Sequence, residues 1–138
     1  MMKVGVTGLA AIHLVVTFWH GRAHQLLAVN LPPEKNAFVF LVIIVAPIAG
    51  TLLVWTRQVG AGVWIFFLSM FASFLFGAYH HFLVISDDHV QHLPAGSANV
   101  QSAFITSAAA LALLEFVSTV YAVFYLLRLR QRSGIARD

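Results

Sequence analysis

The sequence predicts an all-α integral membrane protein, a bundle of four transmembrane helices forming one domain over residues 1–138. Of the 138 residues, 60% are hydrophobic and only 9% are charged, and the mean hydropathy is +0.87. A soluble domain carries about a quarter charged residues. Long charge-free tracts separate the few charged positions, and a spanning helix needs roughly 20 consecutive apolar residues.

The tracts are bounded by charges and by helix-breaking residues. Charged residues are absent from 4–21, 36–56 and 58–86, and the fourth tract, roughly 100–127, contains only Glu115. Proline and glycine mark the turns, at Pro32, Pro33, Gly60, Gly62, Pro94 and Gly96. We expect spans near residues 4–29, 36–57, 60–86 and 99–128. Pro47 lies inside the second span and should kink it.

Lysine and arginine are distributed unevenly along this pattern. With a cytoplasmic N-terminus, two cations lie outside, Arg22 and Lys35, and six lie inside: Lys3, Arg57, Arg128, Arg130, Arg132 and Arg137. The positive-inside rule then predicts that both termini are cytoplasmic, in a bacterial-type inner membrane. The pI of 9.8 reflects this topology rather than nucleic-acid binding. The expected partner is the lipid bilayer, with other membrane subunits or further copies of the chain as candidates.

The residue types also limit the chemistry. The sequence contains no cysteine, which excludes disulfides, zinc-thiolate sites, iron–sulfur clusters and a cysteine nucleophile. It shows no phosphate-binding loop and no dinucleotide fingerprint. Any reaction therefore depends on histidine, aspartate, glutamate or backbone groups, and seven histidines are present.

Three histidines share one face of the first span. At about 100° per residue, His13, His20 and His24 lie within roughly 40° of one another, with Thr17 beside them. A polar stripe inside a membrane should point into the bundle. His20 and His24 have the i, i+4 spacing by which one helix offers two imidazoles to one metal ion.

The third span carries a similar stripe of Ser69, Ser73 and His80. His81 is rotated by about 100° from His80 on a regular helix, so at most one of the two should share the site. In the loop that follows, His89 and His92 have i, i+3 spacing and should face the same side.

Depth along the helices separates these residues into two layers. His13 and Glu115, the one charged residue in the fourth tract, lie near mid-membrane and should face each other, because an unpaired carboxylate there is costly. We interpret them as candidate catalytic or proton-accepting residues. The outer layer, toward the extracytoplasmic side, holds the candidate metal ligands His20, His24, His80, His81, His89 and His92.

The leading hypothesis is a transition-metal site with a redox or oxygen-related role. Imidazole suits iron, copper and zinc, and we expect iron or copper rather than zinc. The pattern of paired histidines is loosely similar to the histidine boxes of membrane-bound desaturases and hydroxylases. The box spacing and the chain length differ, so we do not assign the chain to that family.

Two alternatives stay open at the level of sequence. A b-type haem between the first and third spans would use His13 or His20 opposite His80. A non-catalytic accessory subunit, or a conduit for protons or metal ions, would use the histidines as a relay. The sequence does not decide whether the chain is an enzyme.

Overall fold

The protein is all-helical, as expected. The structure, a computed structural model, describes the backbone of residues 1–135 and side chains through Gln131. Arg137 and the side chain of Arg132, both expected on the inner side, lie outside the described residues. The elements in chain order are α1 Met2–Leu26, α2 Pro33–Phe38, the π-helix η1 Val39–Val45, α3 Ala46–Val54, α4 Val59–Ala78, the π-helix η2 Tyr79–Leu83 and α5 Ala98–Ile135.

These elements form four helices that are long and apolar enough to cross a membrane: Met2–Leu26, Pro33–Val54, Val59–Leu83 and Ala98–Gln131. Large apolar side chains point outward along them, including Phe18, Leu52 and Phe124, which are 66%, 65% and 62% exposed. Apolar surface of this extent is typical of contact with lipid rather than water. The predicted fold class, a four-helix membrane bundle, is confirmed, and contact with a lipid bilayer follows from it.

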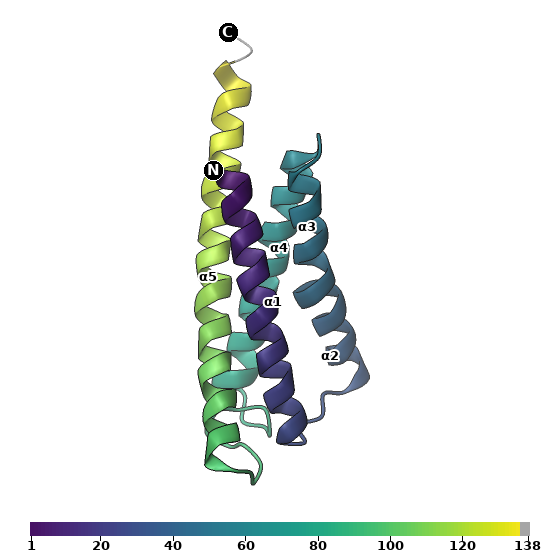
Figure 1. Cartoon of the computed structure of the whole chain (residues 1–138), viewed down its shortest axis with the longest axis vertical. Helices are drawn as coiled ribbons and strands as arrows, with labels where there is room; N and C mark the ends of the chain where they lie inside the picture. Colours follow the sequence, from purple (N-terminus) through teal and green to yellow (C-terminus); the bar gives the residue numbers. More distant parts are fainter. Residues whose placement is uncertain (136–138) are drawn as a thin grey trace.

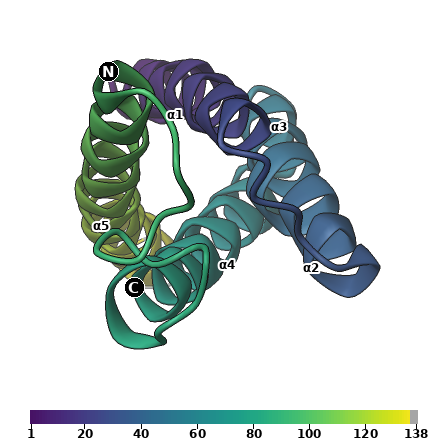
Figure 2. The same ribbon diagram turned by 90° about the horizontal axis from the view of Figure 1, so that it is seen from below.

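The helices pack in a ring in which α1 contacts α5, α5 contacts α4, and α4 contacts α3. The N-terminus, the C-terminal end of α5 and the turn at 55–58 lie at one end of the bundle, which we call the terminal end (Figure 1). The loops 27–32 and 84–97 lie at the opposite end, which we call the loop end (Figure 2). In the loop 84–97, Val90 and Leu93 pack against a buried cluster containing Leu27 and Phe104.

The terminal half of the bundle is closely packed. Two glycines let the backbones of α3 and α4 touch: a Cβ atom on Gly62 would lie 2.6 Å from the Val54 nitrogen, and one on Gly50 would lie 2.8 Å from the Phe66 nitrogen. Small residues commonly allow such close approach between membrane helices. The apolar core of this half consists of Val6, Ala10, Val54, Val63, Phe66, Met70, Ala122 and Tyr125.

The second span departs from α-helical geometry before Pro47. Proline cannot donate the backbone hydrogen bond to the residue four positions earlier, and its ring crowds that carbonyl group. The seven residues Val39–Val45, which precede Pro47, accordingly form a π-helix. The sequence predicted a disturbance of the second span at Pro47, and the structure shows it as a change from α-helix to π-helix. Beyond this segment α2 diverges from α1 toward the loop end (Figures 1 and 2).

The third span contains a second π-helix, Tyr79–Leu83. A π-helical turn accommodates about one more residue than an α-helical turn. The face that Ser73 presents to the bundle therefore continues at His81, eight residues later, instead of at His80. The regular-helix stripe of Ser69, Ser73 and His80 is replaced by one that ends at His81.

Candidate metal centre

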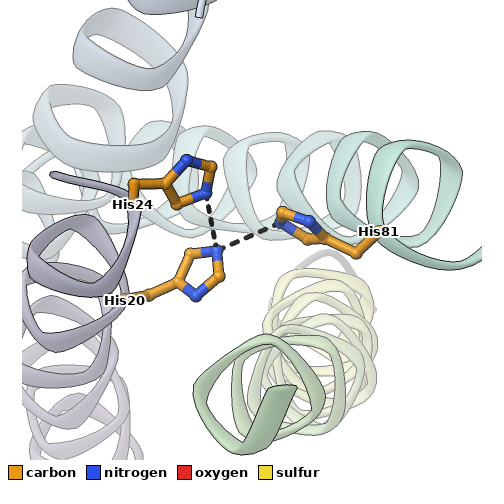
Figure 3. Close-up of side chains that lie close together, drawn as sticks. All are labelled: His20, His24 and His81. Carbon is orange, nitrogen blue, oxygen red and sulfur yellow. Dashed lines mark hydrogen bonds between the residues drawn. The ribbon is translucent and has the colours of Figure 1, made fainter. Parts of the chain in front are cut away.

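Three histidines from two helices converge at the loop end of the bundle. His20 and His24 extend from α1 and His81 extends from η2, and one ring nitrogen of each lies within 4.8 Å of the other two (Figure 3). The Nε2 atom of His20 is 3.2 Å from Nε2 of His81 and 3.1 Å from Nε2 of His24. His20 and His81 are each 7% exposed. The expected convergence of the α1 pair with one of the two adjacent histidines is confirmed, and the histidine is His81.

The hydrogen bonds of Ser107 favour protonation of His20 at Nδ1. The hydroxyl of Ser107 donates to backbone carbonyl groups of its own helix, at 2.6 Å from the Ala103 oxygen and 3.0 Å from the Phe104 oxygen. Because its proton is used there, Ser107 Oγ accepts a hydrogen bond from Nδ1 of His20 at 2.8 Å. The Nε2 atom of neutral His20 is then unprotonated, and its lone pair points at the other two rings.

The same argument applies to His81. Its Nδ1 atom is 2.9 Å from the backbone oxygen of Asp88, which can only accept a hydrogen bond, so Nδ1 carries the proton. The lone pair of Nε2 then faces the lone pair of His20 at 3.2 Å. Two lone pairs at this distance repel each other unless a proton or a metal ion lies between them.

The carboxylate of Asp88 supplies negative charge to the cluster. Its Oδ1 atom lies 3.3 Å from Nε2 of His24 and 3.3 Å from Nδ1 of His81. Burial by itself would raise the pKa of the Asp88 carboxyl, but the imidazoles beside it, His81 above all, outweigh burial and hold that pKa below its usual value. Asp88 is therefore an anion beside three imidazoles.

The two separations that involve His20 match those of ligands on one metal ion, whereas the nitrogens of His24 and His81 lie within 4.8 Å of each other. Two nitrogens about 2.0–2.1 Å from a metal and 3.1–3.2 Å from each other subtend roughly 95–105° at the metal, between octahedral and tetrahedral values. The buried ring of Phe104 covers one side of the cluster, with its centroid 4.8 Å from those of His20 and His24. Three nitrogens, a nearby carboxylate and an apolar wall together could hold a transition-metal ion.

The expected contact of His13 with Glu115 is also confirmed. His13 Nε2 lies 3.2 Å from Glu115 Oε1, and the two residues are 0% and 3% exposed. The pair lies deeper in the bundle than the three-histidine cluster, seven residues before His20 on α1.

A cavity of about 320 Å³ connects the two layers. It is lined by the three histidines and Asp88 at one end and by Glu115 at the other. Gly77 lies in its wall, and a Cβ atom there would be 3.8 Å from Glu115 Oε2 and 3.9 Å from His81 Cδ2. Thr17 and Ser73 also line the cavity, and their buried hydroxyl oxygens have no hydrogen-bond partner in the structure.

The other candidate histidines lie outside this cluster. His80 Nδ1 is 3.4 Å from Lys35 Nζ, and its ring packs against Phe76 and Tyr79. His89 and His92 contact each other in the loop, with their Nδ1 atoms 3.1 Å apart, and neither belongs to the three-histidine group. The structure therefore brings together three of the six expected ligands.

Sequence reasoning missed Ser107 and the direct role of Asp88. Ser107 lies eight residues before Glu115 on α5, about 12 Å closer to the loop end. The distance along α1 from His13 to His20 and His24 is similar. A comparison of the polar residues of α5 by their depth in the membrane would therefore have placed Ser107 at the level of His20. Asp88 lies in an irregular loop, where no periodicity predicts which way a side chain points.

Comparison of the chain with protein-family models, with curated proteins and with solved structures gave no match. The functional argument therefore rests on the geometry of the cluster and the cavity.

Proposed function

We propose that this protein is a membrane metalloprotein in which His20, His24 and His81 bind one first-row transition-metal ion. The observation that carries the proposal is the pair of Nε2 atoms, on His20 and His81, that face each other at 3.2 Å while the Nδ1 atom of each ring hydrogen-bonds elsewhere. A proton could bridge two of these nitrogens, but a metal ion satisfies all three at once. Partners that orient ligand histidines through their second ring nitrogen, as Ser107 and Asp88 do, are typical of metal sites.

The ligand set supports a reactive centre rather than a purely structural one. Three protein ligands leave at least one coordination position open, which is the pattern of catalytic sites. The adjoining cavity gives a small molecule access to that position. Iron and copper are the ions that we propose, because imidazoles with nearby carboxylates suit them and both supply redox or oxygen chemistry.

Glu115 would serve this centre as a proton acceptor. Its carboxylate contacts His13 through Oε1, while Oε2 faces the space beside Gly77. A buried carboxylate that borders the same cavity as a metal ion is placed to take a proton from a molecule bound there.

The two alternative functions fit the geometry less well. A haem between His20 and a histidine of the third span needs room for the macrocycle between the two rings, whereas the His20 and His81 rings are in direct edge contact with centroids 4.8 Å apart. His80 points toward Lys35. A conduit through the membrane would have to pass the closely packed apolar core of the terminal half, whose members Phe66 and Met70 are 0% exposed.

We also propose that the loop end faces the extracytoplasmic side, with both termini cytoplasmic. The support is the charge distribution of the sequence, six cations against two. Reporter fusions to the 84–97 loop and to the C-terminus test this orientation, and a cytoplasmic signal from the loop would reverse it.

The metal site is tested with two neighbouring histidines. His81→Ala should reduce bound iron or copper from about one equivalent to less than a tenth, because it removes a ligand of a three-nitrogen site. His80→Ala should keep the wild-type metal content. The measurement is elemental analysis of protein purified without chelators, with an absorption spectrum that would reveal a haem Soret band.

Each other outcome contradicts part of the proposal. Equal metal content in wild type and His81→Ala would remove the cluster as the metal site. Zinc as the bound metal would preserve the site and exclude the redox role. A Soret band lost in the His80→Ala protein would favour the haem alternative.

A further inference from the structure

The cavity beside the three-histidine cluster has both polar and apolar residues in its lining. The polar residues deep in the bundle are those of the cluster, Asp88, Glu115, Thr17 and Ser73, and Gln25, Asn30 and Asn36 follow toward the loop end. The apolar residues come from three helices and include Val39, Ile43, Phe76, Ala108, Leu111 and Ala112. A pocket with such a mixed lining suits a molecule that has an apolar body and a small hydrogen-bonding head.

Two hydroxyls in the cavity lack partners. Thr17 is 9% exposed and Ser73 is 1% exposed, and neither side-chain oxygen has a hydrogen-bond partner in the structure. Buried hydroxyls are nearly always hydrogen-bonded, because burial without a partner is costly. They belong to α1 and α4, and both residues line the cavity, so a polar group bound there is a candidate partner for them.

The cavity reaches the surface of the bundle within the spans. Its rim on α1 includes the exposed residues Gly21 and Gln25, and its rim on the second span includes the exposed Asn36. Residues 29–31 of the α1–α2 loop line its loop-end side. Between these two rims α2 diverges from α1 (Figure 2).

We infer that the cavity takes a lipid-soluble compound with a hydroxyl head, of the phenol or quinol class, which enters sideways from the bilayer between α1 and the α2–η1 segment. The hydroxyl lies between the Thr17 and Ser73 hydroxyls and within reach of the Glu115 carboxylate, which suits a weakly acidic O–H group. At about 320 Å³ the cavity holds one ring and a few carbons, and a longer tail extends into lipid. This inference rests on the proposed function, since it names the substrate class of the same site.

The test measures binding of 4-octylphenol to the protein in lipid nanodiscs by calorimetry, with empty nanodiscs to subtract partitioning. Gly21→Leu should weaken binding about tenfold or more, because a side chain there extends into open space at the rim. Gly8→Leu is the matched control: Gly8 is also exposed on α1 with nothing within 4 Å of a Cβ, and it does not line the cavity. The Gly8→Leu protein should bind as the wild type does.

A second pair of variants tests the polar end of the cavity. Ser73→Ala should weaken binding of 4-octylphenol about 5- to 10-fold, the order of one hydrogen bond, and should leave binding of 4-octyltoluene unchanged. Ser69→Ala is its control, since Ser69 is equally buried on α4 but donates to the Phe66 oxygen and lies outside the cavity.

Metal analysis of the same samples separates the two proposals. A metal-loaded wild type that does not bind 4-octylphenol, or a Gly21→Leu protein that binds like the wild type, overturns the inference and leaves the metal site intact. Equal affinity for water-soluble 4-hydroxybenzenesulfonate overturns entry from the bilayer. If the wild type contains no metal but binds 4-octylphenol, and the Gly21→Leu protein does not bind it, the metal site is overturned and the binding cavity is supported.

Discussion

The terminal half and the loop half of the bundle are built from the same four helices but differ in what fills the space between them. In the terminal half, glycines and apolar side chains bring α3 and α4 into backbone contact. In the loop half, three histidines, two carboxylates and the residues Thr17 and Ser73 line a cavity of about 320 Å³. The terminal half is therefore closely packed, and the loop half contains the candidate site.

The difference has a physical cause in three sequence positions. Gly50 and Gly62 allow close approach near the turn between α3 and α4. Pro47 removes a backbone hydrogen bond, and the second span diverges on the loop side of the π-helix that precedes it. Polar groups inside a membrane are costly, and the rigid terminal half helps to hold them in place.

The largest expected effect is on the scaffold. Gly62→Ala should lower the free energy of unfolding by about 3 kcal/mol or more, because the new Cβ would lie 2.6 Å from the Val54 backbone and neither helix can shift cheaply. Gly60→Ala, with nothing within 4 Å of its Cβ, should be neutral or slightly stabilising. Thermal unfolding in detergent measures both, and equal stability of the two variants would show that the helix contact is not tight.

The next largest effect is expected on metal binding, with little change in the stability of the bundle. Ser107→Ala removes the acceptor that orients His20 and should weaken metal binding by about 10- to 100-fold, as loss of such partners does elsewhere. The melting temperature of the metal-free protein should change little. Ser102→Ala, exposed on the same helix, is the control. Unchanged metal affinity in Ser107→Ala would contradict the assignment of the His20 tautomer.

The smallest effects are expected at the inner pair. Glu115→Gln keeps an oxygen that can accept from His13, so stability should change by less than about 0.5 kcal/mol. Glu115→Ala leaves a buried His13 nitrogen without a partner and should cost about 1–3 kcal/mol. Both variants should retain the metal, because Glu115 is not in the three-histidine group. Loss of metal in Glu115→Gln would make Glu115 a ligand.

The features of the site that depend on one helix at a time, or on depth in the membrane, could be predicted from the sequence. The polar stripe of α1 follows from the 100° rotation per residue, and it points into the bundle as expected. The contact of His13 with Glu115 followed from their similar depths and from the cost of an unpaired carboxylate. The choice of His81 over His80 did not follow, because it depends on the π-helical turn at Tyr79–Leu83.

The sequence by itself determined that there are four spans and which face of the first span is polar, because charges are excluded from lipid and a regular helix repeats every 3.6 residues. Only the tertiary structure decided that Ser107 and Asp88 orient the histidines, and that α2 diverges to leave a cavity. Those features depend on how the helices and loops pack against one another. Contacts between distant segments are set by this packing, and local periodicity carries no information about it.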